Sequence, residues 1–204
     1  MAERPQYSPP MTPTQPVPSA ADAECVELTR RLRRRGTVVL SVFALLWAFA
    51  AASGTGSATD AVPLTVEVAA VLVTAAAIRF GHRGDAAPSP RTVNLPANWA
   101  RGVGIVNAAE VAAIAAVIAA AAGSGHPRVI PAAVALVVGL HFFPLARLYD
   151  QRQYRWTGAL LAAVAAVGLA LTATGLPDEG LRVVVGLGCA LVLWATAYHL
   201  ALRG

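Results

Sequence analysis

Six long apolar runs separated by short polar segments constrain the fold of this chain more than any other feature. A helix needs about 20 mostly apolar residues to cross the hydrocarbon core of a bilayer, where backbone polar groups must be satisfied within the protein. The segments between the runs are rich in Gly, Pro, Ser and charge, which is typical of loops. The sequence therefore predicts an all-α, polytopic transmembrane helical bundle with spans at about 37–53, 61–80, 100–122, 129–148, 157–175 and 181–201.

The composition agrees with a membrane protein and argues against other classes. Hydrophobic residues make up 56% of the 204 residues and charged residues only 13%, unlike ordinary soluble domains. All 16 basic residues are arginines, and almost all of them lie in the gaps between apolar runs. Because no clustered basic face of a folded domain is visible, we expect no nucleic-acid partner.

The cysteines and histidines do not form a pattern of known chemistry. Cys25 lies in a polar segment and Cys189 in an apolar run, so a disulfide between them is not expected. The His-x-x-x-His and Glu-x-x-His spacings of metal sites are absent, and a bis-histidine haem would need His141 and His199 at one depth. We therefore expect no metal, no cofactor and, without an evident nucleophile, no enzymatic activity.

The first 36 residues form two segments ahead of the transmembrane domain at 37–201. Residues 1–21 contain six prolines and few bulky aliphatics, which predicts a disordered tail. Residues 22–36 predict a short, basic juxtamembrane helix whose arginines contribute about 1 kcal/mol each when they lie beside anionic lipid headgroups. The predicted lipid-facing cluster consists of Arg30, Arg31, Arg33, Arg34 and Arg35.

The gaps between the apolar runs are alternately rich and poor in arginine. Fourteen of them fall on the side of the N-terminus, and only Arg128 and Arg182 fall on the other side. The positive-inside rule then predicts a multi-pass protein of the cell membrane, such as a bacterial inner membrane, with both termini in the cytoplasm. A competing interpretation treats the basic segment and first apolar run as a cleaved signal peptide, which would leave five spans.

Four polar residues within the predicted spans are costly at the depth where they stand, namely Glu67, Asn107, Glu110 and His141. An ionisable group near the bilayer centre costs about 2.5–3.5 kcal/mol, so it usually faces the bundle interior and has a partner. Asn107 and Glu110 share one helix face at i,i+3, and a short loop makes the spans of Glu110 and His141 antiparallel neighbours. We expect these three side chains to converge, whereas Glu67 lies nearer the opposite surface.

Pro144 follows His141 by three positions, and it is expected to kink the fourth span and to free the carbonyl of Leu140 beside the histidine. Burial favours a neutral acid beside a neutral imidazole, unless proximity stabilises the ion pair. Either state makes a proton-exchanging couple conceivable. The alternative interpretation is a hydrogen-bonded staple between the two spans, worth about 0.6 kcal/mol per contact.

Two stretches of the chain contain short motifs, VVGLHFFPLARLY at 137–149 and GIVNAAEVAAI at 104–114. With these motifs the chain resembles small bacterial multi-pass integral membrane proteins of unknown function, which have a G-x-H-F-x-P-L-A motif preceded by an N-x-x-E pair. The resemblance covers residues 37–201 and implies a multi-helix bundle without implying a substrate. The positions that match are Asn107, Glu110, His141, Phe142 and Pro144.

Two function classes follow from the sequence. The first is transport of a small solute, coupled to protons, through a polar site between the third and fourth spans, with Pro144 as the helix kink. The second is a structural or regulatory membrane subunit that binds other helices through its Ala/Gly faces, as a homo-oligomer or with a partner subunit. The substrate and the oligomeric state are open at this stage.

Overall fold

In a computed structural model the chain is a bundle of six α-helices, and the structure describes residues 20–56, 61–83 and 95–203. No strand occurs in these residues, and a short 3-10 helix, η2 (Pro127–Val129), precedes α4. The predicted tail at 1–21 lies almost wholly outside the described residues. The helices are α1 (Ala20–Ala52), α2 (Ala61–Arg83), α3 (Trp99–Gly123), α4 (Ile130–Leu148), α5 (Arg152–Thr172) and α6 (Asp178–Arg203).

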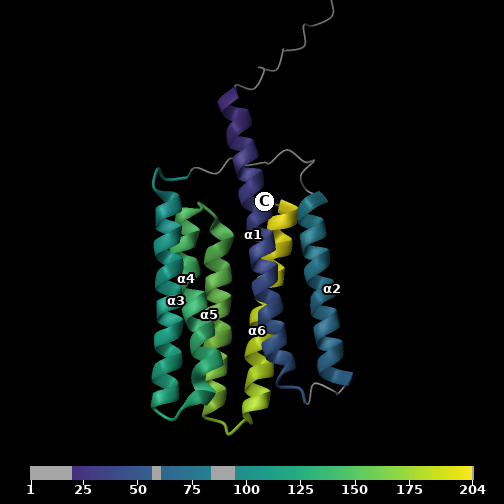
Figure 1. The fold of residues 1–204 in the computed structure, drawn as a ribbon, viewed down its shortest axis with the longest axis vertical. Coiled ribbons are helices and arrows are strands. Elements are labelled where there is room, and N and C mark those ends of the chain that lie inside the picture. The colour runs from purple at the N-terminus through teal and green to yellow at the C-terminus, as the bar shows by residue number, and fades with distance from the viewer. Residues whose placement is uncertain (1–19, 57–60, 84–94, 204) are drawn as a thin grey trace, which may run out of the picture.

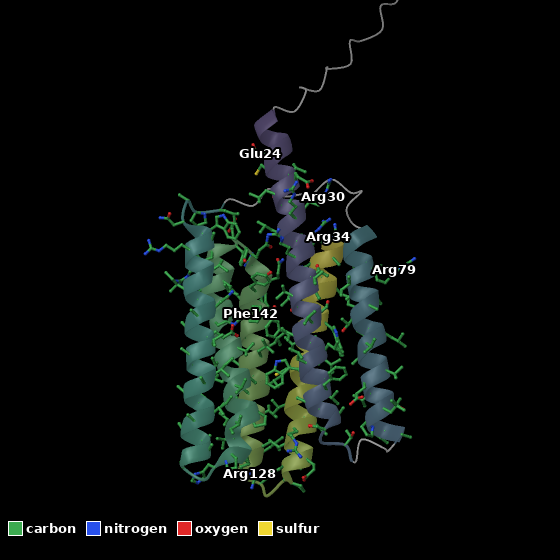
Figure 2. All side chains as sticks on the ribbon, in the orientation of Figure 1. Glu24, Arg30, Arg34, Arg79, Arg128 and Phe142 are labelled. Atoms are coloured by element: carbon green, nitrogen blue, oxygen red, sulfur yellow. The ribbon has the colours of Figure 1, made fainter. Side chains whose placement is uncertain are left out.

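The prediction of a six-span helical fold is confirmed. All six helices are long and apolar enough to cross a membrane, and consecutive helices run in opposite directions (Figure 1). The N-terminal ends of α1, α3 and α5 therefore lie at the same end of the bundle as the C-terminal ends of α2, α4 and α6. We call this the arginine-rich end, because Arg30, Arg34 and Arg79 lie there while Arg128 lies at the opposite end (Figure 2).

Three helices begin at least three residues earlier than the apolar runs predicted. The basic segment and the first span form one continuous helix, α1, whose N-terminal part projects beyond the other helices (Figure 1). α5 begins at Arg152 rather than near 157, two residues after Asp150, which has a positive φ of 49°, and α6 begins at Asp178 rather than near 181. The reason for these differences is that the apolar run marks only the part of a helix that lies in hydrocarbon, whereas helical hydrogen bonding extends past it.

The helices form two groups that meet along one side. α3 packs against α4, which packs against α5, while α1 packs against α2 and α6. The two groups join where α6 contacts α5 and α4, and α2 and α3 lie at the outer edges (Figure 1). As a result, α3 has one main helical neighbour, and its 18-residue apolar window contains no buried residue.

Glycines allow the closest approaches between the helices. A Cβ atom placed on Gly139 of α4 would lie 2.9 Å from the backbone nitrogen of Ala162, and one on Gly158 of α5 would lie 2.7 Å from the carbonyl oxygen of Gly139. Gly186 of α6 meets the backbone of Trp47 on α1 at 2.8 Å in the same way. These contacts agree with the role of small residues in membrane helix packing, where van der Waals contact replaces the hydrophobic driving force.

Buried hydroxyl groups add polar contacts between the helices. The indole nitrogen of Trp194 donates to the Thr74 hydroxyl at 3.1 Å, and that hydroxyl donates to the Ser41 carbonyl at 3.4 Å, which links α6, α2 and α1. Thr157 and Thr196 join α5 to α6 through a 2.8 Å hydroxyl contact. Each of these hydroxyls thereby satisfies a polar atom that would be costly to leave unpaired in a bilayer.

Substitution of Gly139 tests the α4–α5 packing. We expect Gly139→Ala to lower the stability by about 1–3 kcal/mol, because the new methyl group meets backbone atoms that cannot rotate away. Thermal unfolding in detergent measures the change. Gly104→Ala is the matched control, since nothing lies within 4 Å of its Cβ position. Equal melting temperatures for both variants and the parent protein would show that the two helices do not meet at Gly139.

Candidate functional site

The Glu110 carboxyl group and the His141 imidazole are in contact between α3 and α4. His141 Nδ1 lies 3.1 Å from Glu110 Oε1, and the two side chains are 13% and 14% exposed. They meet because α3 and α4 are antiparallel neighbours joined by a short connection at the opposite end of the bundle. The structure therefore brings together two of the four polar residues that the sequence singles out.

The surroundings of His141 define which ring nitrogen carries hydrogen. Nδ1 lies 2.9 Å from the carbonyl oxygen of Val138 as well as near the Glu110 carboxyl group. Because a carbonyl oxygen can only accept, a hydrogen on Nδ1 satisfies this contact and can also point toward Glu110. Within the described part of the chain, His141 Nε2 and Glu110 Oε2 have no hydrogen-bond partner. When the imidazole is neutral and carries its hydrogen on Nδ1, each of these two atoms can therefore accept a hydrogen bond from a ligand.

A cavity of about 390 Å³ adjoins this pair, and both Glu110 and His141 line it. Its walls come from one face each of α1, α3 and α4, with Tyr154 of α5 and Leu193 of α6 closing the inner side. The α1 wall runs from Leu32 to Phe43, a length of about 16 Å at 1.5 Å per residue. This size and shape suit a small elongated ligand, and a largely apolar lining with a few convergent polar groups is typical of ligand sites.

The cavity also has an opening on the side of the bundle. α1 packs chiefly against α2 and α6, and it faces α3 across the cavity. Val39 and Phe43 of α1 and Val111 of α3 line the cavity and are nevertheless among the exposed large apolar residues. A ligand dissolved in the hydrocarbon could therefore reach the Glu110–His141 pair between α1 and α3.

Aromatic rings form a continuous row from the arginine-rich end to the acid–imidazole pair. Trp99 and Tyr149 have ring centroids 5.7 Å apart, Tyr149 and Tyr154 6.0 Å, Tyr154 and Phe142 5.6 Å, and Phe142 and His141 4.9 Å. All five rings line the cavity. Burial raises the pKa of Tyr149, which lies between the α4 and α5 spans, so this ring carries no negative charge at neutral pH.

The other two polar residues from the sequence analysis lie apart from the pair. Asn107 lines the cavity one turn from Glu110, but its side chain is exposed and makes no hydrogen bond within the described residues, so the expected three-way convergence is incomplete. Glu67 lies on α2, which packs against α1 and α6, and it does not line the cavity. The sequence did not show that α2 lies on the far side of α1 from the cavity.

Pro144 lies within α4, which continues as a helix to Leu148. The residue is exposed and does not line the cavity. The carbonyl group beside the histidine ring is that of Val138, where the sequence analysis expected the carbonyl of Leu140. The reason is that the χ angles of a helical histidine point its ring back toward the preceding turn. The kink itself stays a prediction.

The basic cluster of α1 contributes one residue to the site. Glu27 pairs with Arg30 at 3.3 Å and with Arg31 at 2.8 Å, the i,i+4 contact that the spacing favours. Arg35 lines the part of the cavity nearest the arginine-rich end, which we call the mouth, and its guanidinium group has no ion-pair partner within the described residues. At the opposite end, Arg128 lies 3.6 Å from Asp178 and Arg182 lies 3.5 Å from Glu179.

The sequence did not predict the aromatic lining or the position of Arg35 at the cavity. Trp99 and the two tyrosines look like ordinary interfacial aromatic residues, because a sequence pattern gives their depth but not the direction in which they point. Phe43 looks like one lipid-facing residue among many in the first span. Steps of four residues, Trp99–Val103–Asn107 on α3 and His141–Leu145–Tyr149 along α4, could have marked the common face.

The chemistry of the site is limited to polar contacts and protonation. In the part of the chain that the structure describes, no group of three or more His, Cys, Asp or Glu residues could hold a metal ion. Comparison of the chain with known protein families, curated proteins and solved structures found no match. The inference of function therefore rests on the geometry of this cavity.

A double-mutant cycle measures what the Glu110–His141 contact contributes to stability. We expect Glu110→Gln and His141→Ala to show a coupling free energy of about 0.6 kcal/mol, the average for polar contacts between membrane helices. Thermal and denaturant unfolding of both single variants and the double variant in detergent gives this value. Strictly additive effects would mean that the contact does not hold α3 against α4.

Proposed function

We propose that this chain is a multi-pass protein of the cell membrane that moves a small solute in exchange for, or together with, protons at the Glu110–His141 pair. The observation that carries the proposal is a carboxyl group and an imidazole in 3.1 Å contact on the wall of a cavity within the bundle. Ionisable groups inside membrane domains are costly and usually serve binding or proton transfer.

The geometry supports proton exchange in two ways. A carboxyl group and an imidazole at hydrogen-bond distance can share or transfer one proton without a large movement of either side chain. Both residues line the cavity, so a solute that binds there changes the electrostatic surroundings of the pair directly. Binding of the solute and binding of the proton would then influence each other, which is the thermodynamic requirement for coupled transport.

The distribution of arginines supports a specific orientation, with the arginine-rich end in the cytoplasm. Arg30, Arg34 and Arg79 lie at that end, whereas Arg128 and Arg182 at the opposite end each lie beside an acidic residue. The basic cluster Arg30, Arg31, Arg33, Arg34 and Arg35 would lie close to anionic lipid headgroups on the cytoplasmic surface.

Fusion reporters test this orientation in cells. We expect green fluorescent protein fused after Gly204 to fluoresce, and alkaline phosphatase at the same position to stay inactive, because the C-terminus would be cytoplasmic. The same reporters fused after Gly125, in the connection between α3 and α4, are expected to give the reverse result. Phosphatase activity after Gly204 would contradict the proposed orientation.

A structural or regulatory membrane subunit is the second candidate, and the position of α3 favours it. α3 has one main helical neighbour and presents small exposed residues at every fourth position from Gly104 to Ala120, so a further helix could pack closely there. In this case the Glu110–His141 contact would act as a staple between α3 and α4. Such a protein would copurify with a partner or self-associate, and it would show no flux.

Reconstitution in liposomes distinguishes the two candidates. With a pH-sensitive dye inside the vesicles and a pH gradient across the membrane, we expect proton flux above that of empty liposomes. Glu110→Gln should reduce this flux at least about tenfold, because the amide cannot exchange the proton. Glu67→Gln removes a carboxyl group that lies outside the cavity and should leave the flux unchanged. Equal flux for the parent protein and Glu110→Gln would exclude Glu110 from the mechanism.

A further inference from the structure

We propose that the ligand of the cavity is a lipophilic organic cation that carries aromatic or alkyl groups. This inference rests on the proposed function, since it names the substrate class of the same site. Three observations support it, which are the aromatic lining, the position of the carboxyl group and the opening toward lipid.

The aromatic residues of the chain are concentrated at this cavity. The sequence contains 4 Trp, 4 Tyr and 5 Phe, and five of these 13 residues line it. Their ring faces carry partial negative charge, which attracts a cation with a strength of about 0.5–2 kcal/mol depending on desolvation. An anion gains nothing from these faces. The five residues are Phe43, Trp99, Phe142, Tyr149 and Tyr154.

The formal charges along the cavity also favour a cation in its deeper part. Among the described residues, Glu110 is the one acidic residue that lines it, and its Oε2 atom has no hydrogen-bond partner there. A neutral His141 donates a hydrogen bond but does not cancel the charge of an ionised carboxylate. In surroundings of low dielectric constant, this carboxylate attracts a cation far more strongly than it would in water.

Arg35 lies at the other end of the cavity and limits how the cation enters. Along α1, Arg35 lies about 12 Å from Phe43, which lies at the side opening with Val111 of α3, the residue next to Glu110. A cation that approaches through the mouth is repelled by the guanidinium group, whereas the side opening between α1 and α3 is apolar. The ligand must therefore be soluble in the membrane. This requirement selects cations whose charged atom is surrounded by aromatic or alkyl groups of the same molecule.

A pair of probes with the same shape and opposite charge tests the inference. Tetraphenylphosphonium and tetraphenylborate differ mainly in the sign of the charge, and their binding is measured by equilibrium dialysis against protein in phosphatidylcholine nanodiscs, with empty nanodiscs subtracted. We expect saturable binding of tetraphenylphosphonium only. Preferred binding of tetraphenylborate, lost in Arg35→Ala, would overturn the proposal and indicate an anion site at the mouth.

Variants locate the bound cation. Glu110→Gln should weaken tetraphenylphosphonium binding at least about tenfold, equivalent to about 1.4 kcal/mol, while Glu110→Asp should retain most of it and Glu67→Gln all of it. Phe43→Leu should weaken binding about threefold through the loss of one ring face. Phe49→Leu is its control, because Phe49 is an exposed ring of α1 that does not line the cavity. Both phenylalanines are exposed, so neither substitution should unfold the bundle.

The outcomes separate this inference from the proposed function. If tetraphenylphosphonium does not bind above empty nanodiscs while proton flux still depends on Glu110, the substrate class is wrong and the proposal of transport stands. If the cation binds in a Glu110-dependent way without any flux, the cation site is correct and the transport proposal is wrong. Binding that is equal in the parent protein and in Glu110→Gln would overturn the cation site.

Discussion

The exclusion of water from the hydrocarbon core is the constraint on which the rest of this structure depends. In that medium every backbone N–H and C=O must be bonded within the protein, so each apolar run becomes a helix. The same medium removes the hydrophobic drive for helices to associate, and close contact between small residues takes its place. The backbone contact at Gly139 and Gly158 joins α4 to α5, and that at Gly186 joins α6 to α1.

The cavity is a consequence of uneven packing among the six helices. α4 and α5 approach closely, as do α1 and α6, whereas α1 and α3 face each other across space that side chains only partly fill. Glu110 and His141 lie on the walls of that space, where they contact each other and still have one acceptor atom each without a partner among the described residues. A polar pair in this position costs free energy to maintain, and such groups inside a membrane domain usually serve binding, proton transfer or the pairing of helices.

The candidate site was predictable in part. The depth of Glu110 and His141 along their helices, together with the short connection between α3 and α4, was enough to expect them to be neighbours, and the structure places them in contact. Asn107 shares their depth, but it is exposed, because depth does not specify how far a side chain turns toward the bundle axis. The aromatic row was not predictable, since its rings come from α3, α4, α5 and the α4–α5 turn, and the relative rotation of these elements is not encoded in any single apolar run.

By itself, the sequence determined the helical class, the number of spans and the segregation of arginines to one end, because these depend on local hydrophobicity and on the order of segments along the chain. Only the tertiary structure decided that α2 lies apart from the site, that Arg35 lines its mouth and that five aromatic residues surround one cavity. These features depend on which face each helix turns toward its neighbours. That choice is made by close contacts between residues far apart in the chain, such as Gly36 with Tyr154 and Gly139 with Ala162, and a pattern along one helix does not contain it.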